Sequence, residues 1–137
     1  MLDLSKIVLD YFKKNDLSLK MISKLLSQVK VEVIAELADP KDGKKYVISR
    51  NLDMEEYDES KIDRSIERAS NFIKMPVTRA DVMIISRDVK KYLKNLDRNV
   101  YTTSEIRTNI VKSLREQNYP DTAQAYAKQR DYTEDPE

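Results

Sequence analysis

Two short segments of the chain carry cations that could bind phosphate groups. Residues 47–50 end a strand-like run with Arg50, and residues 57–62 open a helix-like pattern that contains Lys61. With Asp58 as the N-cap, Lys61 falls in the first helical turn, where the helix dipole disfavours a cation unless an anion is bound there. Arg50 offers a planar fork of donors and Lys61 a mobile point charge, so the pair suits a polyphosphate. The alternative is that both are ordinary solvated surface cations, which is the commoner situation for charged residues.

Two later segments have polar or aromatic side chains at helical spacing. Residues 102–106 form a helix start rich in hydroxyl groups and free backbone N–H groups, although capping alone would explain them. Residues 122–130 combine small side chains, which let a neighbouring helix approach closely, with Tyr126, which fills space. Packing is the ordinary explanation for such a pattern.

The composition excludes most catalytic devices. The 137 residues include no Cys and no His, which removes disulfides, thiol nucleophiles, zinc fingers and Ser-His triads. Lys plus Arg number 25 and Asp plus Glu 24, so no global field attracts nucleic acid or anionic lipid. The single Gly rules out a glycine-rich phosphate loop. The opening residues fit neither a signal peptide nor a membrane span, and we expect a cytoplasmic protein that is not an enzyme.

The spacing of apolar residues changes once in the N-terminal half of the sequence. Apolar residues recur at helical spacing over 4–12 and again over 21–29, where Ser18 is the expected N-cap, and these patterns predict a helix pair. The period then becomes two, which predicts strands over 31–37 and 45–48 around a turn at 40–43. Residues 54–57 are expected to form a short third strand.

From Asp58 onward the pattern is helical. Four helices are expected, with Pro76 ending the first of them and Pro120 near the start of the last. Thr78 with Asp81, and Thr102 with Glu105, have the spacing of helix-capping pairs. The resulting fold class is α+β, with an N-terminal helix pair and a small antiparallel sheet capped by four helices. We expect a helical extension over 1–30, a compact domain over 31–130 and a flexible tail over 131–137.

Three of these fragments, in this order, resemble the ATP-cone found in ribonucleotide reductases, notably the anaerobic type, and in the transcriptional repressor of reductase genes. The resemblance covers residues 46–130. Its opening motif is matched by Val47, Arg50, Glu55, Tyr57-Asp58 and Lys61-Ile62, its third helix by Thr103 and Ile106, and its last helix by Ala123, Tyr126 and Arg130.

The resemblance implies a nucleotide site for ATP or dATP, with Mg accompanying the phosphates. It implies that Val47 lies against the base or its edge, that Arg50 and Lys61 hold phosphates, and that Glu55, Asp58 and Thr103 contact the nucleoside. The sequence departs from the family pattern at two places. Ser49 replaces the usual Lys before Arg50, and Asn51-Leu52 replaces the usual Asp-Gly turn.

Two functions follow from the sequence. The first is a regulatory module in which nucleotide occupancy controls the oligomeric state of this chain or the activity of a partner, with no membrane involved. The alternative is a DNA-binding regulator in which residues 4–29 form a helix-turn-helix, although the Cys-rich zinc ribbon of the repressor family is absent. In either case the last helix should bury Ala123 and Tyr126 against the helix that contains Ile62.

Overall fold

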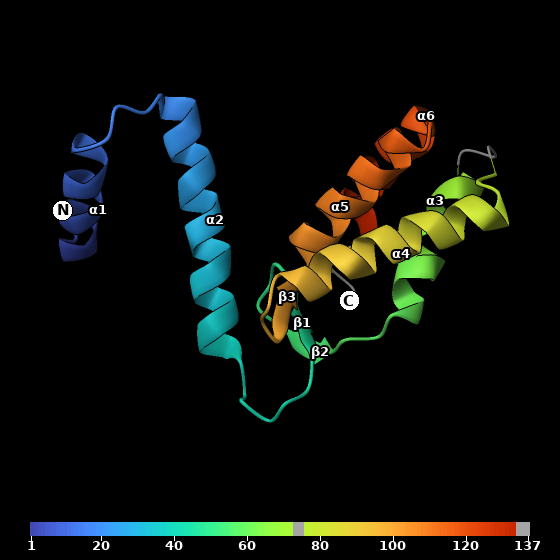
Figure 1. Cartoon of the computed structure of the whole chain (residues 1–137), viewed down its shortest axis with the longest axis horizontal. Coiled ribbons are helices and arrows are strands. Elements are labelled where there is room, and N and C mark those ends of the chain that lie inside the picture. The colour runs from blue at the N-terminus through green and yellow to red at the C-terminus, as the bar shows by residue number, and fades with distance from the viewer. Residues whose placement is uncertain (73–75, 134–137) are drawn as a thin grey trace. The chain divides into compact units, whose positions relative to one another are not determined.

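The computed structural model describes residues 1–72 and 76–133 of the chain. It consists of two compact units, Met1–Ile34 and Ala35–Glu137. Figure 1 labels the helices and strands in chain order. The division between the units falls inside a helix.

The first unit contains α1 (Asp3–Lys13) and most of α2 (Leu19–Ala38). Asp3 lies in the first turn of α1 and Lys13 in its last turn, an arrangement that complements the helix dipole. Ser18 caps α2 as predicted, since its Oγ accepts a hydrogen bond of 3.2 Å from the backbone N–H of Met21.

The predicted strand over 31–37 is wrong, because α2 continues without interruption to Ala38. The less exposed residues of this stretch are Val31, Ile34, Ala35 and Ala38, and their spacing is that of a helix. No Gly or Pro intervenes between Ser18 and Ala38, so a helix started at Ser18 extends at little cost until Pro40. The alternating apolar residues of this stretch are therefore compatible with both periods, and the helix prevails.

The second unit contains a sheet of three short strands, β1 (Tyr46–Ile48), β2 (Met54–Glu56) and β3 (Val100–Thr102). Their order is β2-β1-β3, with β1 antiparallel to β2 and parallel to β3. The predicted strands near 45–48 and 54–57 are confirmed. The expectation of a purely antiparallel sheet is wrong, because Val100–Thr102, of which only Thr102 is predicted, as a helix start, forms a strand parallel to β1.

The β1–β2 turn has an unusual backbone. Leu52 adopts φ of 69°, in the left-handed region, and its N–H donates to the Ser49 carbonyl over 2.9 Å. Leu52 occupies the position where the family pattern has Gly, the residue that adopts this conformation without a steric penalty.

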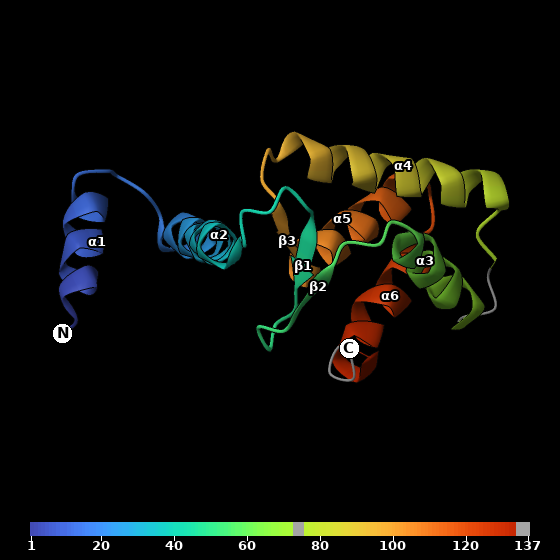
Figure 2. The ribbon, with the colours of Figure 1, turned by 90° about the horizontal axis from the view of Figure 1, so that it is seen from below.

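The sheet is capped by α3 (Ser60–Phe72), α4 (Arg79–Asn95), α5 (Thr103–Glu116) and α6 (Pro120–Thr133). Figure 2 shows these four helices gathered to one side of the strands. The contacts join them in a ring in which α3 packs on α4, α4 on α5, α5 on α6 and α6 on α3. The predicted N-cap Thr78 and the capping box of Thr102 and Glu105 are both present.

The core of this unit lies inside the ring of helices. Ile66, Ile85, Ile110 and Leu114 are fully buried there. Ala123 and Tyr126 of α6 lie in the same cluster as Ile62 of α3, which confirms the predicted packing of the last helix. The family-matching Arg130 has a side chain outside the described residues.

Candidate functional site

A pocket of about 210 Å³ lies where the sheet meets α3, α5 and α6. Its walls combine strand residues, cations of two helices and the ring of a buried tyrosine. The lining residues are Val47, Glu55, Tyr57, Asp58, Lys61, Ile62, Arg64, Ser65, Arg68, Thr103, Ile106, Arg107 and Tyr126.

The structure brings most of the predicted site residues to this pocket. Val47, Glu55, Asp58, Lys61 and Thr103 all line it. Arg50 is not among the lining residues; it stands in the exposed turn between β1 and β2. The predicted convergence of Arg50 with Lys61 is therefore not a feature of this pocket.

The strand register places Val47 and Glu55 side by side. Val47 is the central residue of β1 and pairs with Glu55 of β2 on one edge and with Tyr101 of β3 on the other. Residues directly opposite each other in a strand pair project to the same face of the sheet, so Glu55 stands beside Val47 at the pocket wall.

Asp58 organises the start of α3. Its Oδ1 accepts hydrogen bonds from the Ser60 backbone N–H over 3.0 Å and from the Ser60 hydroxyl over 2.7 Å. These bonds hold the pKa of the Asp58 carboxyl below its ordinary value, so the group is ionised at neutral pH. Asp58 therefore fixes the first turn of α3, from which Lys61 projects.

Three cations follow one face of α3, since Lys61, Arg64 and Arg68 recur at intervals of three and four residues. Lys61 Nζ lies 2.7 Å from Glu55 Oε1, and Arg64 Nη2 lies 3.6 Å from Asp58 Oδ2. The carboxylates that line the pocket thus each face a cation of α3.

Arg107 adds a fourth cation from α5. Its guanidinium carbon lies 5.6 Å from the ring centre of Tyr126, within the range of a cation–π contact. The sequence interpretation missed Arg64, Arg68 and Arg107. The helical spacing after Lys61 could have indicated the first two, but only the fold brings Arg107 to them.

Tyrosines supply the apolar part of the site. The ring of Tyr57 meets that of Tyr101 edge to face, with centres 5.2 Å apart. Burial raises the pKa of the Tyr57 and Tyr126 phenols well above the ordinary value, so both stay protonated. They offer neutral hydroxyl groups and ring surface to a ligand.

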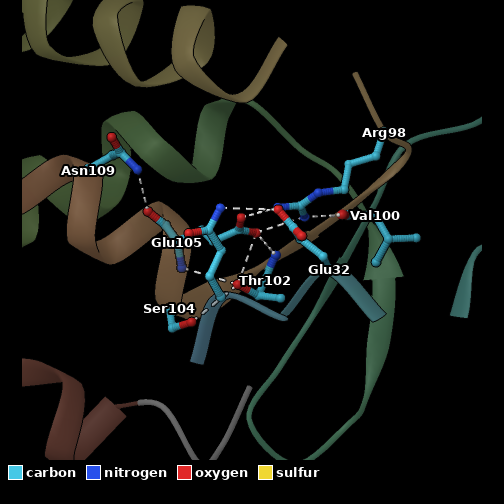
Figure 3. A network of polar contacts seen from close by, with 8 residues as sticks. Glu32, Arg98, Val100, Thr102, Ser104, Glu105 and Asn109 are labelled. Atoms are coloured by element: carbon cyan, nitrogen blue, oxygen red, sulfur yellow. Dashed lines mark hydrogen bonds and ion pairs between the residues drawn. The ribbon is translucent and has the colours of Figure 1, made fainter. Parts of the chain in front are cut away.

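A polar network holds Thr102 and Glu105 at the start of α5, on either side of Thr103 (Figure 3). Arg98 Nη1 donates to the Val100 carbonyl over 2.8 Å and to Glu105 Oε1 over 3.0 Å. Glu105 Oε1 also accepts from the Thr102 N–H over 2.9 Å. The side chains of Arg98 and Glu105 are only 15% and 12% exposed, so this ion pair is largely removed from water.

The chemistry of the pocket is that of an anion site with an apolar wall. Four cations face two carboxylates, and the first turns of α3 and α5 both open onto it. Over residues 1–72 and 76–133 there is no group of three or more His, Cys, Asp or Glu placed to hold a metal ion. Within the same ranges, none of the helices combines the length and apolar character needed to traverse a bilayer.

The chain was compared with known proteins and protein families. No curated protein matches it. Residues 45–135 match the family model described as the ATP cone domain, which covers the sheet and all four helices of the second unit. The chain therefore belongs to the ATP-cone family, whose domain is a nucleotide-binding regulatory module and not a catalytic one.

Proposed function

We propose that the chain is a regulatory protein whose pocket between the sheet and α3 binds ATP or dATP. The observation that carries the proposal is the excess of cations, Lys61, Arg64, Arg68 and Arg107, around a pocket that also offers aromatic rings. Arginine forks and a lysine point charge suit a chain of phosphates, and tyrosine rings suit a base.

Each predicted site residue has a role in this proposal. Val47 lies against the base, Glu55, Asp58 and Thr103 contact the nucleoside, and Lys61 meets the phosphates. Arg50 would join the phosphates only if the β1–β2 turn folded over the ligand. A Mg ion would travel with the phosphates, since Mg commonly takes one or two protein carboxylates together with phosphate oxygens.

The ion pair between Lys61 and Glu55 would have to open before a nucleotide could fill the pocket. The pocket holds about 210 Å³, whereas sites for drug-sized ligands measure about 300–1,000 Å³. We infer that a nucleotide displaces Glu55 from Lys61 and thereby moves β2 relative to α3. Occupancy would then favour one arrangement of the sheet and helices, which is the requirement for regulation by a ligand.

Calorimetric titration of the full chain with ATP, dATP and GTP tests binding, and size-exclusion chromatography with each nucleotide tests control of oligomeric state. Lys91→Ala is a matched control, because Lys91 is an exposed lysine of α4 outside the pocket. Heat from ATP or dATP that persists in Lys91→Ala but falls in Lys61→Ala supports the proposal. Absence of heat from both adenine nucleotides would refute it. A salt-dependent gel shift with the same protein tests the DNA-binding alternative.

A further inference from the structure

A continuous series of contacts leads from the pocket to the end of helix α2. The last turn of α2, from Ala35 on, belongs to the same compact unit as the pocket, and so does the linker of residues 39–45 that joins it to β1. All contacts of the series lie within that unit. They join the wall of the pocket to the point where α2 ends.

The series begins at Tyr57, which lines the pocket and directly follows β2. The Tyr57 backbone N–H donates a hydrogen bond of 2.9 Å to the Lys45 carbonyl. Its ring meets that of Tyr101 with centres 5.2 Å apart, and the Lys45 ammonium lies 5.9 Å from the centre of the Tyr101 ring. A shift of Tyr57 therefore acts on Lys45 both through the backbone and through an aromatic ring.

Asn99 connects Lys45 to the linker. Lys45 Nζ donates to Asn99 Oδ1 over 3.2 Å and to the Arg98 carbonyl over 3.1 Å. Asn99 Nδ2 in turn donates to Asp39 Oδ2 over 3.2 Å, and the other Asp39 oxygen accepts from the Lys41 N–H over 2.8 Å. The amide thus holds its oxygen toward a cation and its nitrogen toward a carboxylate. Since Asp39 is the first residue after α2, this amide fastens the end of the helix to the start of β3.

The bonds of this amide are weak enough for a ligand to shift. Both hydrogen bonds of the Asn99 side chain measure 3.2 Å, at the long end of the range for N–H···O contacts. Lys45 is exposed, so water competes for its ammonium group. One such bond changes an equilibrium by about two- to tenfold. A nucleotide whose affinity differs by that factor between two arrangements is enough to weaken the attachment of the linker.

We propose that the Asn99 amide is a regulatory clamp, which holds the linker after α2 on β3 and which nucleotide binding opens. This rests on the proposed function, in which a nucleotide displaces Glu55 and moves β2. Tyr57 directly follows β2, so it moves with the strand and draws Lys45 away from Asn99. The amide then loses the partner of its oxygen and can rotate away from Asp39. Asn99 is a positioning residue, since it is not among the residues that line the pocket.

Thermodynamic linkage gives the proposal a direction. If nucleotide binding opens the clamp, a protein whose clamp is already open binds the nucleotide more tightly, because no binding energy is used to open it. Damage to the fold would have the opposite effect on affinity. Tighter binding therefore distinguishes a clamp from a purely structural contact.

Calorimetric titration of the full chain with ATP tests this expectation in two variants, Asn99→Ala and Asp39→Asn. The first removes the amide, and the second leaves one acceptor oxygen for the N–H donors of both Lys41 and Asn99. Each variant should bind ATP about two- to tenfold more tightly than the wild type. The double variant should bind no more tightly than either, since both changes open the same clamp.

Asn95→Ala is the matched control, because Asn95 is an exposed asparagine at the end of α4 and outside the pocket lining. It should leave the affinity for ATP unchanged. Unchanged or weaker binding in both clamp variants overturns the proposal.

Hydrogen–deuterium exchange of the wild type follows the clamp without any substitution. ATP should speed exchange in peptides that cover residues 35–45, and Asn99→Ala should show this faster exchange already without ATP. If ATP binds by calorimetry but leaves the exchange of these peptides unchanged, the clamp is overturned and the nucleotide site stands. A wild type that gives no heat with ATP or dATP removes the nucleotide site and the clamp together.

Discussion

Lys61 Nζ lies 2.7 Å from Glu55 Oε1, so a cation of α3 is held by a carboxylate of β2 at the wall of the pocket. Both side chains are about half exposed, at 49% and 52%. An exposed ion pair of this kind contributes about 0–1 kcal/mol to folding. The pair therefore contributes little to the stability of the fold.

Lys61→Ala should weaken ATP or dATP binding by about 1.5–3 kcal/mol, because it removes a charge-assisted contact to phosphate. The melting curve of the free variant should nearly overlay that of the wild type, since surface substitutions usually change stability by about 0.5 kcal/mol or less. Titration calorimetry and thermal melts measure the two effects. Arg50→Ala is tested beside it. An equal loss of nucleotide affinity in this variant would show that the β1–β2 turn reaches the ligand. An unchanged affinity would show that Arg50 is not part of the site.

Glu105→Ala should destabilise the second unit by about 3–5 kcal/mol, because it leaves the largely buried Arg98 guanidinium without its counter-charge. The same change removes half of the capping box of α5. Glu105→Gln keeps an acceptor for the Thr102 N–H but also lacks the charge, so it should recover only the capping part of the loss. Urea unfolding curves of the three proteins measure the difference, and a Glu105→Gln variant as stable as the wild type would contradict the role of the charge.

Leu52→Gly should stabilise the β1–β2 turn. A left-handed conformation costs a non-glycine residue about 1–2 kcal/mol, and glycine forfeits about 0.5–1 kcal/mol of chain entropy, so a net gain of about 0.5–1 kcal/mol is expected. Thermal melts of the variant and the wild type measure this gain in stability. Leu52→Ala is the control, because alanine removes the side chain but keeps the strain. A gain of equal size in both variants would show that the exposed leucine, and not its backbone, is unfavourable.

Alkaline pH should destabilise the second unit through its buried tyrosines. Burial raises the folded-state pKa of Tyr126 above the value of about 10 that an unfolded tyrosine has. Its contribution is therefore fully present below about pH 10 and is lost as the pH rises from there toward the folded pKa. The melting temperature of Tyr126→Phe should fall less steeply above pH 10 than that of the wild type, whereas Tyr11→Phe, which alters an exposed tyrosine of α1, should follow the wild type. Parallel slopes for all three proteins would contradict this linkage.

The sequence predicted the helical part of the ATP-cone well, because Thr78, Thr102 and Pro120 mark helix starts by local chemistry that needs no tertiary context. It failed at residues 31–37, where alternating apolar residues satisfy both a strand and a helix and only the uninterrupted run from Ser18 decides between them. It also missed β3, since three residues carry no periodic signal and their partner lies more than fifty positions earlier in the chain. Arg107 joins the pocket for the same reason, through the fold and not through a local pattern.

The parallel pairing of β1 with β3 also determines when the pocket can form while the chain is being synthesised. Tyr46 pairs with Val100, so the first wall of the pocket finds its sheet partner only after α3 and α4 have been made. The last wall, Tyr126, follows still later. A growing chain therefore has only the lining residues of β1, β2 and α3 at first, and the walls that contain Thr103 and Tyr126 join them after α5 and α6 have been made. If the pocket binds a nucleotide as proposed, its affinity reports on whether α5 and α6 have closed the ring of helices.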